Sequence, residues 1–158
     1  MIREDLIALI RNCEKDKTYD KLKNIDVSEI FDFSLMFINC SFENIDFLSN
    51  WDVSNGINYS RMFLNCSNLK NVNGLLKWNM SKSIFLGKMF MNCYSLENID
   101  GLKFWNVSKV EIFENMFLRC LSLSELKPLK FWNVSSATQL NGMFRGTKIR
   151  ELDGLDFW

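Results

Sequence analysis

Four cysteines recur at nearly equal intervals and have the most evident chemical potential in the chain. They are Cys40, Cys66, Cys93 and Cys120, separated by 26, 27 and 27 residues. Thiolates ligate soft metals, but zinc sites prefer closely spaced pairs such as Cys-x-x-Cys, and the chain has none. Thr147 holds the equivalent place one interval later, which suits a small buried residue better than an obligatory ligand. We therefore interpret the cysteines as free thiols packed in a core, and expect neither a metal nor a cofactor.

Other catalytic patterns are missing from the sequence. The 158 residues include no histidine, which excludes imidazole nucleophile pairs, imidazole metal ligands and histidine pH switches. No glycine-rich phosphate loop or nucleophile elbow is present. Asn-x-Ser triplets recur, but most follow from the repetition of the chain, and we interpret them as turn residues and not as glycosylation sites. Asp46, Asp100 and Asp153 recur at one phase and predict a solvated polar face. Together these features predict that the protein is not an enzyme.

Charge and hydropathy limit the partners. Nineteen Lys and Arg balance nineteen Asp and Glu, so the broad positive field that attracts nucleic acid is absent. No segment approaches the ~20 apolar residues that span a bilayer, so no membrane insertion is expected. The first residues lack the basic leader and apolar run of an export signal. As written, the sequence predicts a cytoplasmic protein.

An internal repeat organises the chain. Met-Phe pairs begin at residues 36, 62, 89, 116 and 143, and all five tryptophans keep the same interval. Repeats of 20–29 residues are typical of leucine-rich repeats, in which each unit is too short to bury its own apolar face. Neighbouring units must therefore stack and share one core. We expect an α/β solenoid, a leucine-rich-repeat-like stack of about five coils of 26–27 residues.

Local patterns suggest what one coil contains. Trp-Asx-Val-Ser alternates apolar and polar residues, which predicts a short parallel strand. Asn106 and its equivalents are expected to hydrogen-bond the backbone at the following bend. The segment from Ser108 to Cys120 has helical spacing and begins with a Ser108–Glu111 capping box, so a short helix or 3₁₀ turn is expected. A second extended piece should then run through Leu123, Leu126 and Leu129.

The two ends of the chain differ. Residues 1–23 do not match the repeat, and apolar residues from Ile2 to Cys13 recur at helical intervals. We expect an N-terminal amphipathic helix that caps a repeat domain at 24–158, the alternative being a partner-binding helix. Trp158 stands where a further coil would open. End-to-end self-association through Trp158 is therefore left open.

The repeat units resemble those of the BspA-like leucine-rich repeat proteins. The resemblance rests on Trp-Asn/Asp-Val-Ser, then Met-Phe, Asn-Cys and Leu, as in residues 51–54, 62–63, 65–66 and 69. It covers about residues 24–158 in five copies, although Gly146-Thr147 replaces Asn-Cys in the last. The family consists mostly of bacterial surface proteins, so the resemblance implies adhesion or other protein contacts without catalysis. It also implies a cell-surface location where such a sequence follows a leader.

Apolar residues occupy some columns in which the repeat otherwise has polar ones. If Trp and Val point inward, the residue just before each Trp points outward. Exposed apolar rows mark contact surfaces, whereas the alternative is that these side chains fold back on a neighbouring bend. The candidate partner-binding residues are Phe31, Ile57, Ile84, Phe85, Phe104, Ile112, Phe131 and Phe157.

The sequence therefore predicts a non-catalytic protein-binding module with a protein as its partner. Two classes stay open. The first is a surface or adhesive repeat domain of the BspA-like type. The second is a small cytosolic binder that neutralises a protein partner, such as an immunity protein or antitoxin, which the compact size and free thiols favour.

Overall fold

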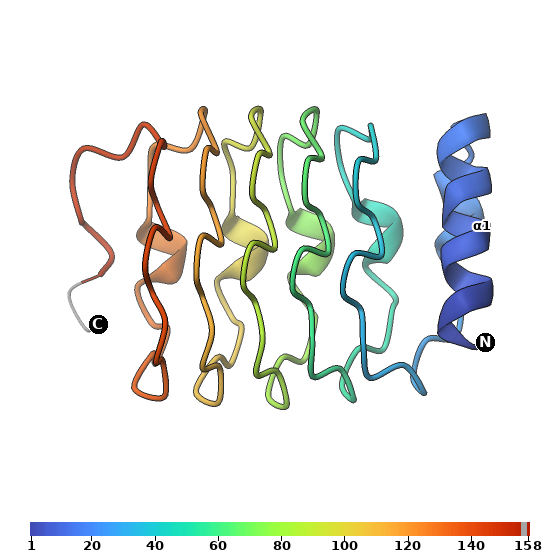
Figure 1. The fold of residues 1–158 in the computed structure, drawn as a ribbon, viewed down its shortest axis with the longest axis horizontal. Helices are drawn as coiled ribbons and strands as arrows, with labels where there is room; N and C mark the ends of the chain where they lie inside the picture. Colours follow the sequence, from blue (N-terminus) through green and yellow to red (C-terminus); the bar gives the residue numbers. More distant parts are fainter. Residues whose placement is uncertain (156–157) are drawn as a thin grey trace.

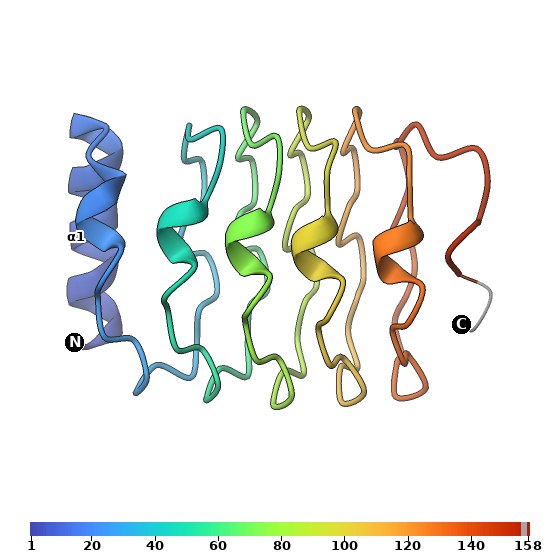
Figure 2. The same ribbon diagram turned by 180° about the vertical axis from the view of Figure 1, so that it is seen from behind.

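The computed structural model describes residues 1–155 and 158 of the chain. Helix α1 (Arg3–Asp16) lies across one end, and the rest of the chain winds into a row of stacked coils (Figure 1). Each winding climbs one side of the stack, turns, and descends the other side. The descending side carries one short 3₁₀ turn per winding (Figure 2). These turns are η1 (Tyr19–Leu22), η2 (Asp46–Leu48), η3 (Asn73–Leu75), η4 (Asp100–Leu102) and η5 (Lys127–Leu129).

The expectation of an α/β solenoid with short parallel strands is wrong. The described residues contain one α-helix, the 3₁₀ turns and isolated parallel bridges, but no strand and no sheet. Most of each winding is irregular backbone held by turns. The bridges are Asp32–Asn58, Asn58–Phe85, Asn71–Asn98, Phe85–Ile112 and Ile112–Gln139.

Left-handed residues on the ascending side explain why no strand forms. The residues just before each Met and three after it have φ near +60°, as in Arg61 (58°) and Asn65 (63°). Each one reverses the local direction of the backbone, so alternate N–H groups bond within their own winding. Met62 N donates to Tyr59 O at 3.1 Å, whereas Phe63 N donates to Met89 O of the next winding at 2.9 Å. Only every second residue is thus available to a ladder between windings.

The segments of each winding that were predicted to be helical and extended are also exchanged. The segment from Ser108 to Cys120, expected to be helical, consists of turns and carries the Ile112 bridge. The segment expected to be extended, through Leu129, contains η5. In the segment from Ser108 to Cys120, repeated turns produce the helical spacing of the apolar residues, so the predicted Ser108–Glu111 capping box does not form. Instead Asn106 Oδ1 accepts bonds from Ser108 N (3.2 Å) and Ser108 Oγ (2.7 Å), the bend bond expected of Asn106.

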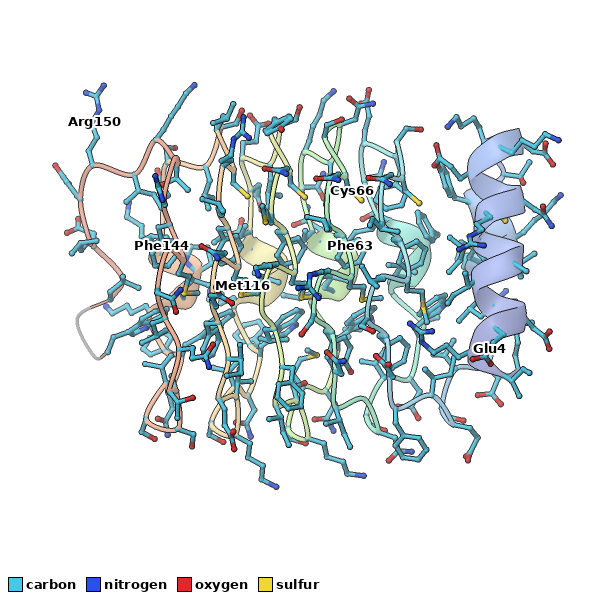
Figure 3. All side chains as sticks on the ribbon, viewed as in Figure 1. Glu4, Phe63, Cys66, Met116, Phe144 and Arg150 are labelled. Carbon is cyan, nitrogen blue, oxygen red and sulfur yellow. The ribbon has the colours of Figure 1, made fainter. Side chains whose placement is uncertain are left out.

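Aromatic side chains stack in register along the core. Trp105 lies parallel to Trp78 and to Trp132, with ring centroids 6.5 and 6.3 Å apart. A second ladder runs through the phenylalanines of the Met-Phe pairs, where Phe63 and Phe90 are 5.5 Å apart. Phe63 and Met116 lie inside the stack, while Arg150 points away from it (Figure 3). Each winding therefore buries its neighbour's rings, which no winding could do alone.

Helix α1 closes the N-terminal end of the stack. Its Leu6, Ile10 and Cys13 are buried against the first winding. The first winding has no preceding winding to donate to its carbonyl groups, and Arg3 takes that role: its guanidinium donates to Asp32 O at 2.8 Å and to Ser34 O. The helix thus caps both the apolar core and the hydrogen-bond ladder.

The other end of the stack presents an open ladder. Within the described part of the chain, the backbone N–H groups of Leu140, Gly142, Phe144 and Gly146 have no acceptor, although their equivalents in earlier windings do. Trp158 stacks on Trp132 with centroids 6.3 Å apart. End-to-end self-association through Trp158 stays a prediction from the sequence. None of the described helices has the length and apolar character to cross a membrane.

In η3 and η4 the 3₁₀ turn approaches the preceding winding so closely that a side chain in place of the central glycine has no room. A Cβ added at Gly101 would lie 1.8 Å from Val72 O. We expect Gly101→Ala to lower the free energy of unfolding by about 1–3 kcal/mol, because η4 must shift away from its neighbour. Pro128 occupies the equivalent position in η5. The loss of stability therefore reflects the contact between these two windings and not the 3₁₀ turn itself. Urea denaturation followed by tryptophan fluorescence measures the loss.

Gly87→Ala is the matched control for that experiment. A Cβ there would first meet Ile112 Cγ2 at 3.3 Å, the end of a flexible side chain. Its stability should stay within about 0.5 kcal/mol of the wild type. Equal losses in the two variants would contradict the close approach of the 3₁₀ turns.

Glu14 joins α1 to the first winding and makes this junction sensitive to acid. Burial raises the pKa of Glu14, but hydrogen bonds from Lys17, Tyr19 and Ser41 outweigh it and lower the pKa to about 2. Ser41 N donates to its carboxylate at 3.0 Å and Ser41 Oγ at 2.9 Å. Because the folded pKa lies below the ordinary 4.5, this stabilisation is complete above about pH 4.5 and is lost as the pH falls toward 2.

We therefore expect Glu14→Gln to cost stability at neutral pH and little at low pH. Loss of the charge-assisted bonds should lower the free energy of unfolding by about 1–2 kcal/mol near pH 7. The gap to the wild type should narrow below about pH 4, where the wild-type carboxylate begins to gain a proton. Thermal unfolding across this pH range measures the difference in stability between the variant and the wild type. A difference that does not change with pH would refute the low pKa assigned to Glu14.

Candidate recognition surface

The predicted contact residues that the structure describes belong to the bends along the edge of the stack at the bottom of Figure 1. We call this the turn edge. It consists of the bends around each Trp-Asx-Val-Ser segment, and in the first winding Ile25 takes the place of Trp. Its residues are 23–32, 49–58, 76–85, 103–112 and 130–139.

Seven of the eight predicted residues can be placed on this edge. Phe31, Ile57, Phe85, Phe104 and Phe131 are exposed, and Ile84 and Ile112 are half-buried. Phe157 lies outside the described residues. These side chains come from three columns of the repeat, two neighbouring columns after the repeat serine and one just before the tryptophan, and we describe them as a first and a second row.

Backbone bonds between windings hold the first row in register. Ile57 N donates to Phe31 O at 2.8 Å, and Ile84 N donates to Ile57 O at 2.9 Å. Phe85 and Ile112 face each other in a parallel bridge. Ile57 and Ile84 also line a shallow hollow of about 440 Å³ together with Lys82 and Lys109. Phe31, Ile57 and Ile84 thus follow one another in one column, and Phe85 and Ile112 continue the row in the neighbouring column.

The second row is shorter and far more exposed. Phe104 and Phe131 occupy the same position in adjacent windings, with 70% and 71% of their surface exposed. The buried Trp105 and Trp132 follow them, so the chain turns the phenylalanines outward. Lys103 Nζ lies 5.3 Å from the ring centroid of Phe104, and Lys130 Nζ lies 5.7 Å from that of Phe131.

Sequence reasoning missed the lysines that accompany both rows. Lys103 and Lys130 directly precede the phenylalanines, Lys82 and Lys109 directly follow the repeat serines, and Lys77 occupies the phenylalanine column, so the columns of the repeat contained the signal. The neutral charge of the whole chain concealed this signal. These lysines are Lys77, Lys82, Lys103, Lys109 and Lys130, and all are exposed.

The cysteine column proves to be part of the core. Cys66, Cys93 and Cys120 are fully buried, and each thiol donates to the carbonyl of a phenylalanine one winding earlier, as Cys66 Sγ does to Phe37 O at 3.1 Å. Burial raises the pKa of the Cys120 thiol to about 12 and that of Cys66 and Cys93 well above 9.0. A protonated, buried thiol is neither a nucleophile nor a metal ligand.

The titratable groups of the described residues do not gather elsewhere into a metal centre. No group of three or more Cys, Asp or Glu side chains among them could hold a metal ion. A hollow of about 680 Å³ lies between residues 124–127 and residues 147–151 and 153. Its charged lining alternates in sign, with Lys127 and Arg150 beside Glu125 and Asp153, so it concentrates no single chemistry.

Comparison with known proteins gives one family. Residues 4–117 and 94–156 each match the family described as "Mycoplasma protein of unknown function, DUF285". The two matches overlap at residues 94–117, as expected when a repeated unit aligns in two registers. No curated protein and no solved structure matches the chain. Because the matches together span residues 4–156, the chain belongs to this DUF285 family.

Proposed function

We propose that the protein is a non-catalytic recognition module that binds another protein through its turn edge. The observation that carries this proposal is the exposure of Phe104 and Phe131, at 70% and 71%, on adjacent windings. A phenylalanine ring so exposed leaves a large apolar area in water, and rows of such rings are typical of contact surfaces.

The frame beneath the two rings is rigid, which favours binding. Trp105 and Trp132 stack at 6.3 Å, and their indole N–H groups donate to Leu75 O and Leu102 O, both at 3.0 Å. Binding then orders few additional side chains, so less conformational entropy is lost on association. The core fixes the spacing of the anchors in advance of contact.

The BspA-like resemblance favours an adhesive or surface role for this module. The five free, buried cysteines suit the alternative, a binder that neutralises a protein inside the cell. The identity of the protein captured in the experiment below decides between these classes, since a host or matrix protein supports the first and a toxin supports the second.

Phe104→Ala combined with Phe131→Ala tests the proposal. The exposed rings contribute little to the core, so we expect the thermal transition to stay within a few degrees of the wild type. Partner binding should weaken at least about tenfold, since buried aromatic anchors carry most of the affinity of an interface. The measurement is affinity capture with wild type and variant, followed by titration calorimetry with the captured protein.

Leu121→Ala provides the control for loss of an exposed apolar side chain elsewhere. Leu121 is exposed on the bend opposite the turn edge and should not affect capture. Undiminished binding by the double phenylalanine variant would overturn the proposal. Collapse of its thermal transition would show instead that the rings belong to the core.

A further inference from the structure

Charge is segregated along the turn edge, although the whole chain is neutral. The last three bends, residues 76–85, 103–112 and 130–139, contain five lysines and one acid, Glu111. The first two bends, residues 23–32 and 49–58, contain four acids and one lysine, Lys23. The edge therefore has a basic part and an acidic part.

The lysines of the basic part have no ionic partners within the described residues. Five ion pairs are found there, and none involves Lys77, Lys82, Lys103, Lys109 or Lys130. Lys82 Nζ donates instead to the neutral Asn55 Oδ1 at 2.7 Å. Lys103 and Lys130 are equivalent residues of adjacent windings, as are Lys82 and Lys109, and adjacent windings lie about 5 Å apart, so like charges accumulate along this part of the edge. An anionic ligand would offset their repulsion.

Two of the lysines are paired with the exposed rings. Lys103 and Lys130 hold their ammonium groups beside Phe104 and Phe131, at 5.3 and 5.7 Å from the ring centroids. Each winding thus offers one cation and one apolar face side by side. A ligand that matches this pattern alternates carboxylates with apolar groups at a similar spacing.

Resting on the proposed function, we infer that the partner contributes an extended acidic polypeptide segment, with Asp or Glu at alternate positions, which lies along residues 76–139 of the turn edge. Side chains at alternate positions of an extended chain lie about 6.6 Å apart on one face, somewhat more than the 5 Å between windings, so two or three acidic side chains match the length of the basic part. Carboxylates would pair with Lys103 and Lys130, while apolar side chains cover Phe104 and Phe131.

Single-stranded nucleic acid, which also combines anions with flat rings, fits the edge less well. A nucleic acid carries its charge uniformly, and the basic part extends over only three bends, about 15 Å. Beyond it the carboxylates of Asp26, Glu29, Asp32 and Asp52 would repel a continuing phosphate backbone. A polypeptide can confine its acidic residues to the basic part.

The test measures binding of a defined probe by fluorescence anisotropy. The probe is a labelled peptide of about eight residues with Glu at alternate positions and Leu or Thr between them. The matched peptide has Gln in place of Glu, and an oligouridylate of similar length represents nucleic acid. The protein variants are Lys103→Gln with Lys130→Gln, and, as control, Lys15→Gln with Lys148→Gln away from the turn edge.

We expect the Glu peptide to bind at least about tenfold more tightly than the Gln peptide, with an affinity that falls as salt is raised. The Lys103/Lys130 variant should lose about tenfold in affinity, whereas the control should match the wild type. Equal binding of the two peptides, or an unaffected Lys103/Lys130 variant, would overturn the inference. Tighter binding of oligouridylate through the same lysines would overturn it in favour of nucleic acid.

The outcomes separate this inference from the function on which it rests. If the Glu peptide fails but the phenylalanine variant still loses its captured protein, the acidic partner is wrong and the recognition module stands. If the phenylalanine variant captures its partner normally, the recognition module itself is refuted.

Discussion

The buried apolar side chains of the stack depend on neighbouring windings for burial. One winding is a single layer of chain and is too thin to bury its own side chains. Its rings become buried only when the next winding places an identical ring above them at about 5.5 Å. This dependence explains the close approach at Gly101, where a Cβ would separate the layers. The N-terminal end needs α1 for the same reason. Arg3 donates hydrogen bonds that a preceding winding would otherwise donate, and Leu6 packs where the core of such a winding would lie.

The sequence predicted the stacking register but not the backbone that produces it. Columns of Trp, Met-Phe and Cys identify the buried residues because burial constrains residue type, and those columns are indeed buried. The left-handed residues before each Met are Leu35, Arg61, Lys88, Asn115 and Gly142, and only the last two are of types associated with positive φ. Stacking imposes that conformation on Leu35, Arg61 and Lys88, which do not favour it, although the asparagines three places after the Met, at 39, 65 and 92, were a local sign of it. The apolar spacing around Val110 and Phe113 then imitated a helix.

The candidate surface, too, could be predicted from the sequence only in part. That Phe104 and Phe131 point outward follows from their place beside an inward Trp, so the sequence could predict it. That Lys103 and Lys130 lie beside the rings depends on side-chain conformations, which no spacing rule supplies. Whether two columns share one face depends equally on how tightly the bend turns. The sequence therefore indicates which residues are available for contact, and the structure indicates which of them act together.

A stack of this kind separates stability from recognition. Residues that face inward are constrained by both neighbours, and a change in one column must be matched in the windings on either side. Residues on the turn edge have no such neighbours in the core, so Asn50, Lys77, Phe104 and Phe131 can hold one equivalent position without altering the fold. The acids of the first bends and the lysines of the last use this freedom: each winding can carry a different charge on an identical frame. The frame therefore tolerates segregated charge on an otherwise neutral protein, and the persistence of lysines across three adjacent bends supports the acidic partner inferred above.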